Sequence, residues 1–364
     1  MKPLSEIGAA VVGTGFIGVV HVEALRRLGV QVHGVVGSSH ERAAARSREL
    51  NLPPAYESFE AMLEDERVEV VHVTSPNHLH HRHASAALRA GKHVVCEKPL
   101  AMTTSESADL LRLAEQSGLV HAVNFNLRFY PLCQHVHGLI GGHAIGDVRL
   151  ISGHYLQDWL LLDTDWNWRL EPSLGGQLRA VADIGSHWMD LTSFLCGRPI
   201  TEVMADLATF IKKRRDREMT TDDAATIMLR YGGETRGAFT VSQVSAGRKN
   251  SLAYEIDGSG SSVAWNSERP DELFIGHRGR PSEVLLRDPA LLNEEGRRAT
   301  WLPGGHAEGF GDTFKALYAA VYGAVAEGKP AAGYPTFADG HDSMLVCDAV
   351  ARSSRERRWI EVKR

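Results

Sequence analysis

The sequence contains no long hydrophobic run. Among its 364 residues, no apolar stretch approaches the roughly 20 residues that a transmembrane helix needs. The first six residues, Met-Lys-Pro-Leu-Ser-Glu, also lack the apolar core and the cleavage site of a secretory signal peptide. We therefore expect a soluble, cytoplasmic protein with no membrane partner.

Cysteine is scarce, and its placement argues against two kinds of site. The four cysteines lie far apart and form no Cys-x-x-Cys pair, so neither a zinc ribbon nor a redox-active dithiol is indicated. Reduced thiols in a cytosolic protein are the simplest interpretation. The residues are Cys96, Cys133, Cys196 and Cys347.

Positive charge is not concentrated anywhere in the chain. The formal net charge is −5, and the short basic segments 212–217 and 352–358 are interrupted by acidic residues. We interpret them as solvated faces and expect no nucleic-acid partner. Hydrophobic residues make up 43% and charged residues 23%, which is typical of a globular protein with a full core. The length exceeds what one core supports, so two domains are expected.

The first third of the chain alternates short apolar runs with helical patterns. Such βαβ alternation, with strands that are apolar on both faces, predicts an α/β fold with a parallel, doubly wound sheet. The predicted strands are residues 7–12, 30–36, 68–73, 92–96 and 119–123. The predicted helices are residues 19–28, 41–50, 59–64, 78–90 and 103–117.

The pattern changes near Pro131 to longer alternating segments, which predict an open, mixed or mostly antiparallel sheet with one face free for a partner. We therefore place a nucleotide-binding domain at residues 1–125 and a second, α+β domain at residues 126–364. The Gly-, Pro- and charge-rich residues 267–298 are predicted to form a mobile excursion. The predicted strands are 148–156, 202–211, 224–231, 236–244, 253–257 and 262–265, and the predicted helices are 132–140, 184–195, 310–327 and 337–353.

Residues 13–18, Gly-Thr-Gly-Phe-Ile-Gly, follow a predicted strand and open a helix. In that context Gly13 permits a tight turn, Gly15 lets the backbone approach a pyrophosphate, and Gly18 allows close packing of helix on strand. The helix N-terminus, with Phe16 and Ile17, offers N–H groups and a positive dipole end to the phosphates. A glycine turn without a ligand is the alternative, but the strand–turn–helix context favours an NAD or NADP cofactor.

The residue that selects between NAD and NADP is expected about 20 positions further on. The second predicted strand ends at Gly37, followed by Ser38 and Ser39, so this strand end has no carboxylate to bind both ribose hydroxyls. The two hydroxyl groups and Arg42 suit a 2′-phosphate, which favours NADP. Backbone contacts at Gly37 would also permit NAD.

The triplet Glu97-Lys98-Pro99 ends an apolar run at the predicted carboxyl edge of the parallel sheet, where such sheets bind ligands. A partly desolvated lysine in this place is suited to bind or deprotonate a substrate hydroxyl. The competing interpretation is a surface lysine that merely ends a strand, and the triplet alone does not decide between the two.

Residues 74–83 contain four histidines, which raises the question of a zinc site. No His-Glu-x-x-His motif or other usual ligand spacing occurs there, so we expect no metal. We expect instead that Ser75 and Pro76 form the loop under the nicotinamide half of the coenzyme, and that Asn77 caps the next helix.

Asp183 and His187 are four residues apart at the start of a predicted helix and therefore share a face. An imidazole with a carboxylate one turn away can hold a proton near neutral pH. That suits the removal of a proton from an alcohol as hydride leaves its carbon. The alternative is an Asp N-cap and a core histidine, but Lys98 and the glycine fingerprint in the same chain favour catalysis.

Residues 163–169 combine aromatic rings with polar groups, as sugar sites do. Trp166 and Trp168 can stack on a sugar ring while Arg169 binds its hydroxyls. A domain-interface cluster is an equally good interpretation of this segment. Asn126 and Arg128 lie where the first domain passes into the second, and they either line the cleft or stiffen the hinge.

Together these residues resemble the Gfo/Idh/MocA oxidoreductases, the glucose–fructose oxidoreductase and inositol dehydrogenase family. The matching motifs extend over nearly the whole chain. They are the fingerprint at 13–18, Ser75-Pro76-Asn77 with His80, Glu97-Lys98-Pro99, Asn126 and Arg128 before Pro131, and Gly175-Gly176 followed by Asp183, Gly185, His187 and Asp190.

The resemblance implies a Rossmann domain and a C-terminal domain whose open sheet forms a homodimer or homotetramer. It also implies hydride transfer between NAD(P) and a secondary hydroxyl or ketone of a sugar, inositol or related polyol. The implied coenzyme-binding residues are Gly13, Gly15, Phe16, Ile17, Gly18, Ser38, Ser39, Arg42, Ser75, Pro76, Asn77, His80, Glu97, Lys98 and Asn126. The implied substrate-binding residues are Lys98, Arg128, Trp166, Trp168, Arg169, Asp183 and His187.

Lys98 matches the catalytic lysine of the family, and Asp183 with His187 matches its catalytic pair. The resemblance is also compatible with a cis bond between Lys98 and Pro99, since proline permits one. We expect the substrate to bind between the domains, with Lys98 on the reacting hydroxyl and His187 as general base assisted by Asp183.

Three alternatives to a sugar or polyol dehydrogenase stay open. Some family members use tightly held NAD for transient oxidation during glycoside cleavage or epimerisation. Others could act as non-catalytic sensors of the cofactor, although intact Lys98, Asp183 and His187 argue against that. The third alternative is a reductase of a non-sugar carbonyl.

Overall fold

The computed structural model describes residues 2–330 and 333–364, and the chain divides into two compact units. The first unit comprises Met1–Asn126 and Gly311–Met344, and the second comprises Leu127–Phe310 and Leu345–Arg364. Each unit is therefore built from two separate stretches of the chain. Within the described residues, no helix is both long and apolar enough to cross a membrane.

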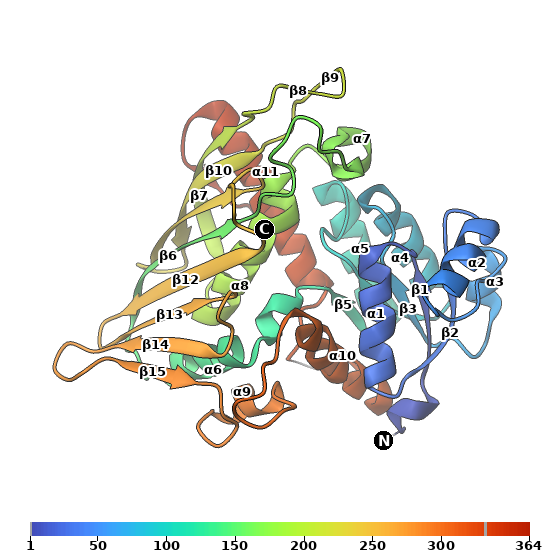
Figure 1. The fold of residues 1–364 in the computed structure, drawn as a ribbon, viewed down its shortest axis with the longest axis horizontal. Coiled ribbons are helices and arrows are strands. Elements are labelled where there is room, and N and C mark those ends of the chain that lie inside the picture. The colour runs from blue at the N-terminus through green and yellow to red at the C-terminus, as the bar shows by residue number, and fades with distance from the viewer. Residues whose placement is uncertain (1, 331–332) are drawn as a thin grey trace. The chain divides into compact units, whose positions relative to one another are not determined.

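The first unit contains a five-stranded sheet in the order β2-β1-β3-β4-β5, and every neighbouring pair is parallel (Figure 1). This confirms the predicted doubly wound sheet. The strands are β1 (Gly8–Val12), β2 (Gln31–Val36), β3 (Val70–Val73), β4 (His93–Cys96) and β5 (His121–Val123). The helices are α1 (Phe16–Arg27), α2 (His40–Glu49), α3 (Phe59–Glu64), α4 (His80–Arg89), α5 (Thr104–Ser117) and α10 (Phe310–Glu327), whose first residue belongs to the second unit.

The strands of this sheet are apolar throughout because both faces are covered. All five residues of β1 are buried, and its neighbour β3 is buried along its whole length. Helix α5 shows why the helical segments start and stop where the sequence predicts. Thr103 and Glu106 form a capping box at its start, and Gly118, with φ of 65°, ends it in the left-handed conformation.

The second unit contains a nine-stranded sheet in the order β15-β14-β13-β12-β6-β11-β10-β7-β16. Only the β6–β11 pair is parallel, which confirms the prediction of a mixed, mostly antiparallel sheet. The strands are β6 (Val148–Leu156), β7 (Ile200–Ala208), β10 (Ala224–Tyr231), β11 (Arg236–Ser242), β12 (Ser251–Gly258), β13 (Ser262–Asn266), β14 (Glu272–Gly276), β15 (Glu283–Leu286) and β16 (Ile360–Glu361). A separate hairpin is formed by β8 (Lys213–Arg214) and β9 (Arg217–Glu218).

The longer helices of the second unit lie along one face of this sheet, whereas two short ones, α7 (Pro172–Gly175) and α9 (Glu294–Arg298), lie apart from it (Figure 1). The longer helices are α6 (Pro131–Gly141), α8 (Ser186–Cys196) and the second part of α11 (Phe337–Glu356). Buried residues from α6, α8 and α11 pack with the inward-facing residues of the strands in a single core. The strands alternate accordingly, as in β10, where residues with buried and less buried side chains follow one another.

Residues 267–298 do not form the predicted excursion. They contain β14, β15 and α9, and the two strands extend the sheet beyond β13. Leu273 is fully buried and pairs with Trp265, so this hairpin contributes to the core. The prediction was wrong because it rested on composition: Glu272 and Glu283 occupy exposed positions of the two strands, and Gly279 and Pro281 lie in the turn between them.

Candidate active site

The turn after β1 and the first turn of α1 each fit only glycine at one position. Gly13 has φ of 126°, and a Cβ there would lie 2.5 Å from the Thr74 hydroxyl oxygen. A Cβ at Gly18 would lie 2.1 Å from the carbonyl oxygen of Gly13, so strand and helix approach closely. At Gly15 a Cβ would meet no atom of the described chain within 4 Å, and the backbone there faces open space.

Helix α1 begins with N–H groups that no side chain caps. Its N-cap is Gly15, with no side-chain hydrogen bond, and Phe16 in the first turn is 75% exposed. Ile17 lies in the same turn. A helix N-terminus of this kind attracts phosphate groups through its free N–H donors and its positive dipole end. The residues present therefore fit a dinucleotide.

The strand order places this turn at the point where ligands bind in such sheets. Strand β1 lies between β2 and β3, so the strand order reverses at β1: β2 is added on one side of it and β3 on the other. Thr74, directly after β3, donates its hydroxyl hydrogen bond to the Val12 carbonyl at 3.0 Å. This bond joins the carboxyl ends of the two strands at that point.

The loop after β2 presents exposed polar side chains. Ser38, Ser39 and Arg42 are all exposed. The Ser39 hydroxyl accepts a hydrogen bond from the Arg42 backbone N–H at 3.3 Å and so caps α2. A Cβ at Gly37 would lie 2.8 Å from the Ala43 Cβ, which explains why this strand end carries glycine and no acidic side chain.

The loop after β3 is held by buried histidines. Both ring nitrogens of His80 lie 2.7 Å from backbone oxygens, one from Ser75 and one from Pro99. Burial lowers the pKa of His80, although these two carbonyl groups act in the opposite direction. The Ser75 hydroxyl lies 3.0 Å from Nδ1 of His83. His80 thus links the loop that follows β3 to the loop that follows β4.

Asn77 does not cap α4 as predicted. It begins a 3₁₀ turn, Asn77–Leu79, and α4 then starts after Leu79 without a side-chain cap. This 3₁₀ turn separates Asn77 from the first residue of α4, so Asn77 is not the N-cap of that helix. The nearby histidines have separate partners, such as Asp109 for His81. Within the described residues no group of three or more His, Cys, Asp or Glu side chains could hold a metal ion.

The triplet after β4 contains a buried carboxylate and a partly exposed lysine. The Lys98–Pro99 peptide bond is cis. One carboxylate oxygen of Glu97 accepts hydrogen bonds from His21 Nε2, at 3.0 Å, and from the Asn124 side-chain amide. The other accepts the Lys98 backbone N–H at 3.2 Å. Glu97 therefore fixes the backbone from which the Lys98 side chain extends.

Behind Glu97 lies a chain of hydrogen bonds that the sequence analysis missed. His21 Nδ1 lies 3.0 Å from His72 Nδ1, and His72 Nε2 lies 3.0 Å from the Tyr322 hydroxyl. Because an ionised carboxylate can only accept, His21 donates to Glu97 from Nε2. With neutral rings, His72 then donates to His21 and accepts from Tyr322. Burial, followed by the influence of His21, holds the pKa of His72 well below its ordinary value, which favours the neutral ring.

In the second unit, Asp183 lies in a π-helical turn, Val181–Gly185, directly before α8. Such wide turns occur frequently at functional sites. One carboxylate oxygen of Asp183 accepts a hydrogen bond from Arg169 Nε at 3.1 Å, and the other accepts one from Gln243 Nε2 at 2.8 Å. The Arg169 guanidinium also lies over the ring of Trp168, 4.4 Å from its centroid. The structure thus brings these two predicted substrate-binding residues to Asp183.

His187 follows in the first turn of α8 and is 8% exposed. Its ring centroid lies 6.5 Å from that of Tyr155. The Tyr155 hydroxyl donates to Asn250 at 2.9 Å, and burial raises its pKa, with the charge of Asp183 as a smaller contribution. Tyr155 therefore remains a neutral hydroxyl beside His187.

Three predicted residues are engaged in other contacts. Trp166 lies beneath the guanidinium groups of Arg217 and Arg215, whose carbons are 5.1 and 5.7 Å from its ring centroid. Arg128 is buried and forms a two-point ion pair with Asp190, with 2.8 Å from Nε to Oδ2. Asn126 is also buried, and its amide donates to the Thr313 hydroxyl at 2.7 Å.

The glycine turn at the switch point of a parallel sheet, followed by an open mixed sheet, defines an NAD-binding oxidoreductase. The chain belongs to the Gfo/Idh/MocA oxidoreductases. Residues 7–125 match the oxidoreductase family with an NAD-binding Rossmann fold, and residues 133–264 match the GFO/IDH/MocA C-terminal domain. The predicted resemblance is confirmed, and the protein is an NAD(P)-dependent dehydrogenase.

Several relatives match along nearly their whole length. Levoglucosan dehydrogenase of Pseudarthrobacter phenanthrenivorans is 29% identical over 99% of both chains. A structure of levoglucosan dehydrogenase in complex with NADH and levoglucosan has a TM-score of 0.92, with 28% identity over 98% of this chain and all of that one. An oxidoreductase domain protein from Kribbella flavida has a TM-score of 0.90, with 31% identity over 99% of this chain and all of that one.

Proposed function

We propose that the protein oxidises a secondary hydroxyl of a sugar, anhydrosugar or cyclic polyol, with Lys98, Asp183 and His187 as the residues that act on the substrate. The observation that carries the proposal is the Asp183 carboxylate, which is held through both oxygens on a π-helical turn next to His187. The full-length similarity to a levoglucosan dehydrogenase supports a sugar as the substrate.

Each proposed residue has one chemical task. The Lys98 ammonium group hydrogen-bonds the reacting oxygen and stabilises its negative charge as the proton leaves. His187 accepts that proton, and Asp183 stabilises the resulting imidazolium. A bound nicotinamide ring supplies the acceptor for the hydride from the carbinol carbon. The alcohol thereby loses a proton from its oxygen and a hydride from its carbon and becomes a ketone.

The positions of the other predicted residues indicate which of them bind the substrate and which hold the site in shape. Arg169 and Trp168 are suited to hydrogen-bond and stack on a ring because they already form one face beside Asp183. We assign Arg128, with its ion pair to Asp190, and His80, between two backbone carbonyls, to holding the site in shape. The turn around Gly13 would hold the pyrophosphate.

The decisive experiment replaces Lys98 by Ala and measures turnover on a panel of levoglucosan, D-glucose and myo-inositol with NAD and NADP. We expect kcat to fall by about 10²–10⁴-fold, the usual contribution of a positioned catalytic group. NADH binding, followed by fluorescence, should survive. Replacing the exposed Lys329 by Ala is the matched control and should leave both unchanged. Full turnover by the Lys98→Ala variant would rule out the proposed mechanism.

We further propose that the loop after β2 lets the enzyme use NADP as well as NAD. It exposes Ser38, Ser39 and Arg42 where a 2′-phosphate would need partners. Arg42→Ala should raise KM for NADP about tenfold, the typical effect of losing one charge-assisted hydrogen bond, and leave KM for NAD unchanged. An equal effect on both coenzymes would contradict this assignment.

The exposed face of the nine-stranded sheet supports the proposed homodimer or homotetramer. It carries Leu150, Met228, Phe274, Val284 and Leu286, which are between 41% and 61% exposed. Exposed apolar patches of this kind mark protein contacts. Light scattering should therefore give an oligomer, and Phe274→Asp should shift it toward the monomer. A wild-type monomer at micromolar concentration would contradict the proposal.

A further inference from the structure

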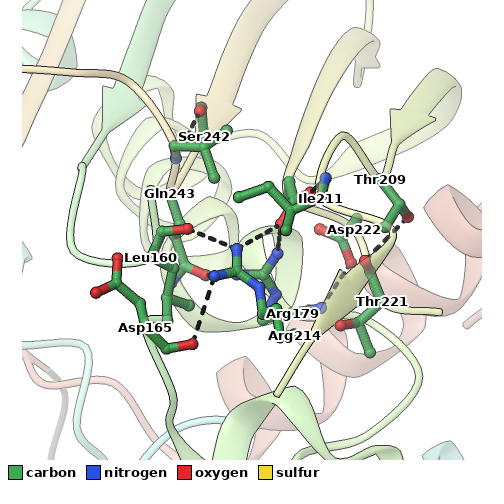
Figure 2. A network of polar contacts seen from close by, with 12 residues as sticks. Leu160, Asp165, Arg179, Thr209, Ile211, Arg214, Thr221, Asp222, Ser242 and Gln243 are labelled. Carbon is green, nitrogen blue, oxygen red and sulfur yellow. Dashed lines mark hydrogen bonds and ion pairs between the residues drawn. The ribbon is translucent and has the colours of Figure 1, made fainter. Parts of the chain in front are cut away.

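A group of buried charged side chains lies beside the strand ends of β10 and β11 (Figure 2). Asp223, directly before β10, pairs with both Arg179 and Arg214. All three side chains are at most 1% exposed. Buried charges are costly unless each has a partner, so this network keeps a defined geometry only while it is complete.

Gln243, directly after β11, connects this network to Asp183. Its side chain is fully buried. Arg179 Nη1 lies 3.2 Å from Gln243 Oε1, and Gln243 Nε2 lies 2.8 Å from Asp183 Oδ2. A guanidinium group can only donate hydrogen bonds, so the atom that faces Arg179 must be the amide oxygen. The amide nitrogen therefore has to face Asp183.

The same arginine also ties down the backbone that carries Asp183. The Asp222 carboxylate accepts hydrogen bonds from the backbone N–H groups of Arg179, at 2.6 Å, and Val181, at 2.8 Å. The Arg179 carbonyl then accepts the N–H of Asp183 at 2.7 Å. The buried network of charged side chains thus holds both the backbone of the π-helical turn and the side chain of Asp183 on it.

We propose that Gln243 is a positioning residue for Asp183, oriented by the buried Arg179–Asp223–Arg214 network. Its amide N–H fixes one carboxylate oxygen of Asp183, and with it the orientation of that group on the π-helical turn that leads into the helix of His187. Arg169 holds the other oxygen, but it is partly exposed and lies over Trp168, so it belongs to the substrate side. Gln243 is the support from the protein interior. The inference rests on the proposed catalytic role of Asp183.

The test uses the full-length enzyme with Gln243→Glu. A glutamate has the shape of glutamine and still accepts from Arg179, but when ionised it places a negative charge where Asp183 needs a donor. We expect kcat for the panel sugar that is oxidised fastest to fall about 10–100-fold, which corresponds to one hydrogen bond to a charged group. The primary isotope effect on kcat, with substrate deuterated at the reacting carbon, should rise. NADH affinity should change little, whereas the melting temperature should fall, because an ionised glutamate faces Asp183 in a buried position.

Two further variants separate this role from a merely structural one. Gln243→Met removes both contacts and should lower kcat by a similar factor while also lowering the melting temperature, because Arg179 loses a partner. Gln31→Glu is the control, since Gln31 Nε2 also donates to an oxygen, the Ser5 carbonyl, at 2.8 Å, away from the residues proposed to act on the substrate. This control should keep full kcat. Wild-type kcat in Gln243→Glu would overturn the inference.

Asp183→Asn keeps failure of the inference distinct from failure of the proposed function. If Asp183→Asn retains wild-type kcat, Asp183 is not catalytic and the proposed function fails at this residue. If Asp183→Asn is inactive while Gln243→Glu remains fully active, only the positioning role of Gln243 is wrong. Loss of kcat in both variants, with NADH binding intact, is the expected result.

Discussion

The two units support their proposed reacting residues with buried networks of opposite composition. In the first unit, the Glu97 carboxylate bonds the side chains of His21 and Asn124, and His21 is linked through His72 to the Tyr322 hydroxyl. All of these side chains other than Glu97 are uncharged as long as the two histidine rings carry one proton each. Their hydrogen bonds depend on which ring nitrogen carries the proton, and burial holds the pKa of His72 well below its ordinary value, so protonation of that ring in acid costs stability.

In the second unit, the support of Asp183 begins with ion pairs. Arg179 and Arg214 share Asp223, and only the last link, Gln243, is neutral. Arginine keeps its charge throughout the pH range of proteins. Such a network does not change protonation easily, but it tolerates no missing partner. The comparison teaches that these two buried networks should lose stability under different conditions. The histidine network of the first unit should be weakened by acid, and the arginine network of the second unit by removal of one of its side chains.

The largest effect is expected from Asp223→Ala. It leaves two buried arginines without their shared carboxylate, and breaking a buried pair in this way costs about 3–5 kcal/mol. Urea denaturation should show the loss in the free energy of unfolding, and hydrogen exchange should locate it in β10 and β11. Asp206→Ala, on an exposed position of β7, is the control and should cost less than about 0.5 kcal/mol. A loss below about 1 kcal/mol in Asp223→Ala would remove the contrast between the networks.

Lowering the pH from 7 to 5 should weaken the first unit more than the second. Burial lowers the pKa of both His83 and His121 to about 4. An unfolded histidine takes up its proton near pH 6.5, well before the folded one, so the stability from each ring is complete above pH 6.5 and is lost as the pH falls. The loss is about 2 kcal/mol per ring at pH 5.

Asp222, in the second unit, changes the stability with pH in the opposite direction to these histidines. Burial raises its pKa to about 6, against the hydrogen bonds it accepts. The folded carboxyl group takes up a proton before the unfolded one does, so its contribution rises by about 1 kcal/mol as the pH falls from 7 to 5. Hydrogen exchange at both pH values, corrected for intrinsic rates, compares the units directly. His121→Gln keeps an acceptor for the Phe337 N–H and should remove part of the acid loss. Equal destabilisation of both units would contradict the comparison.

The smallest effect concerns the far end of the histidine chain. Tyr322→Phe leaves His72 Nε2 without its donor and should cost about 1 kcal/mol in thermal or urea unfolding. Tyr231→Phe is a matched variant in the second unit, since its hydroxyl contacts Thr192, which also bonds the Trp188 carbonyl. That variant should cost less, because Thr192 keeps a partner. A larger loss of stability in Tyr231→Phe than in Tyr322→Phe would show that the histidine network does not depend on the Tyr322 hydroxyl.

Much of the fold could be predicted because it is encoded by local periodicity. The apolar strands, the glycine fingerprint and the helix 310–327 all appear in the structure, as do the strands around the parallel pair β6–β11. Two predictions went wrong where local chemistry was misjudged. Residues 267–298 form a hairpin and a short helix despite their composition, and a 3₁₀ turn separates Asn77 from α4.

The buried networks could not be predicted because their members are far apart in the sequence. His21 and His72 are separated by 51 positions, and His72 and Tyr322 by 250. Weak signals were present: a histidine interrupts the apolar strand β3, and two aspartates precede β10. The lysine triplet and the Asp183–His187 pair are short-range motifs, which is why the sequence analysis singled them out. Their catalytic roles remain the proposal to test.

The division of the first unit into two stretches of chain has a consequence for protein synthesis. The last strand of its sheet ends at Val123, but Tyr318 and Tyr322, which contact Asn124 and His72, lie about 200 residues further on. At roughly 5–20 residues per second, the ribosome adds them about 10–40 s later. During that interval the newly made sheet lacks the two tyrosine side chains that pack against it. Folding of this unit therefore finishes only after most of the chain has been translated, and a fragment that ends near residue 126 should need chaperones to stay in solution.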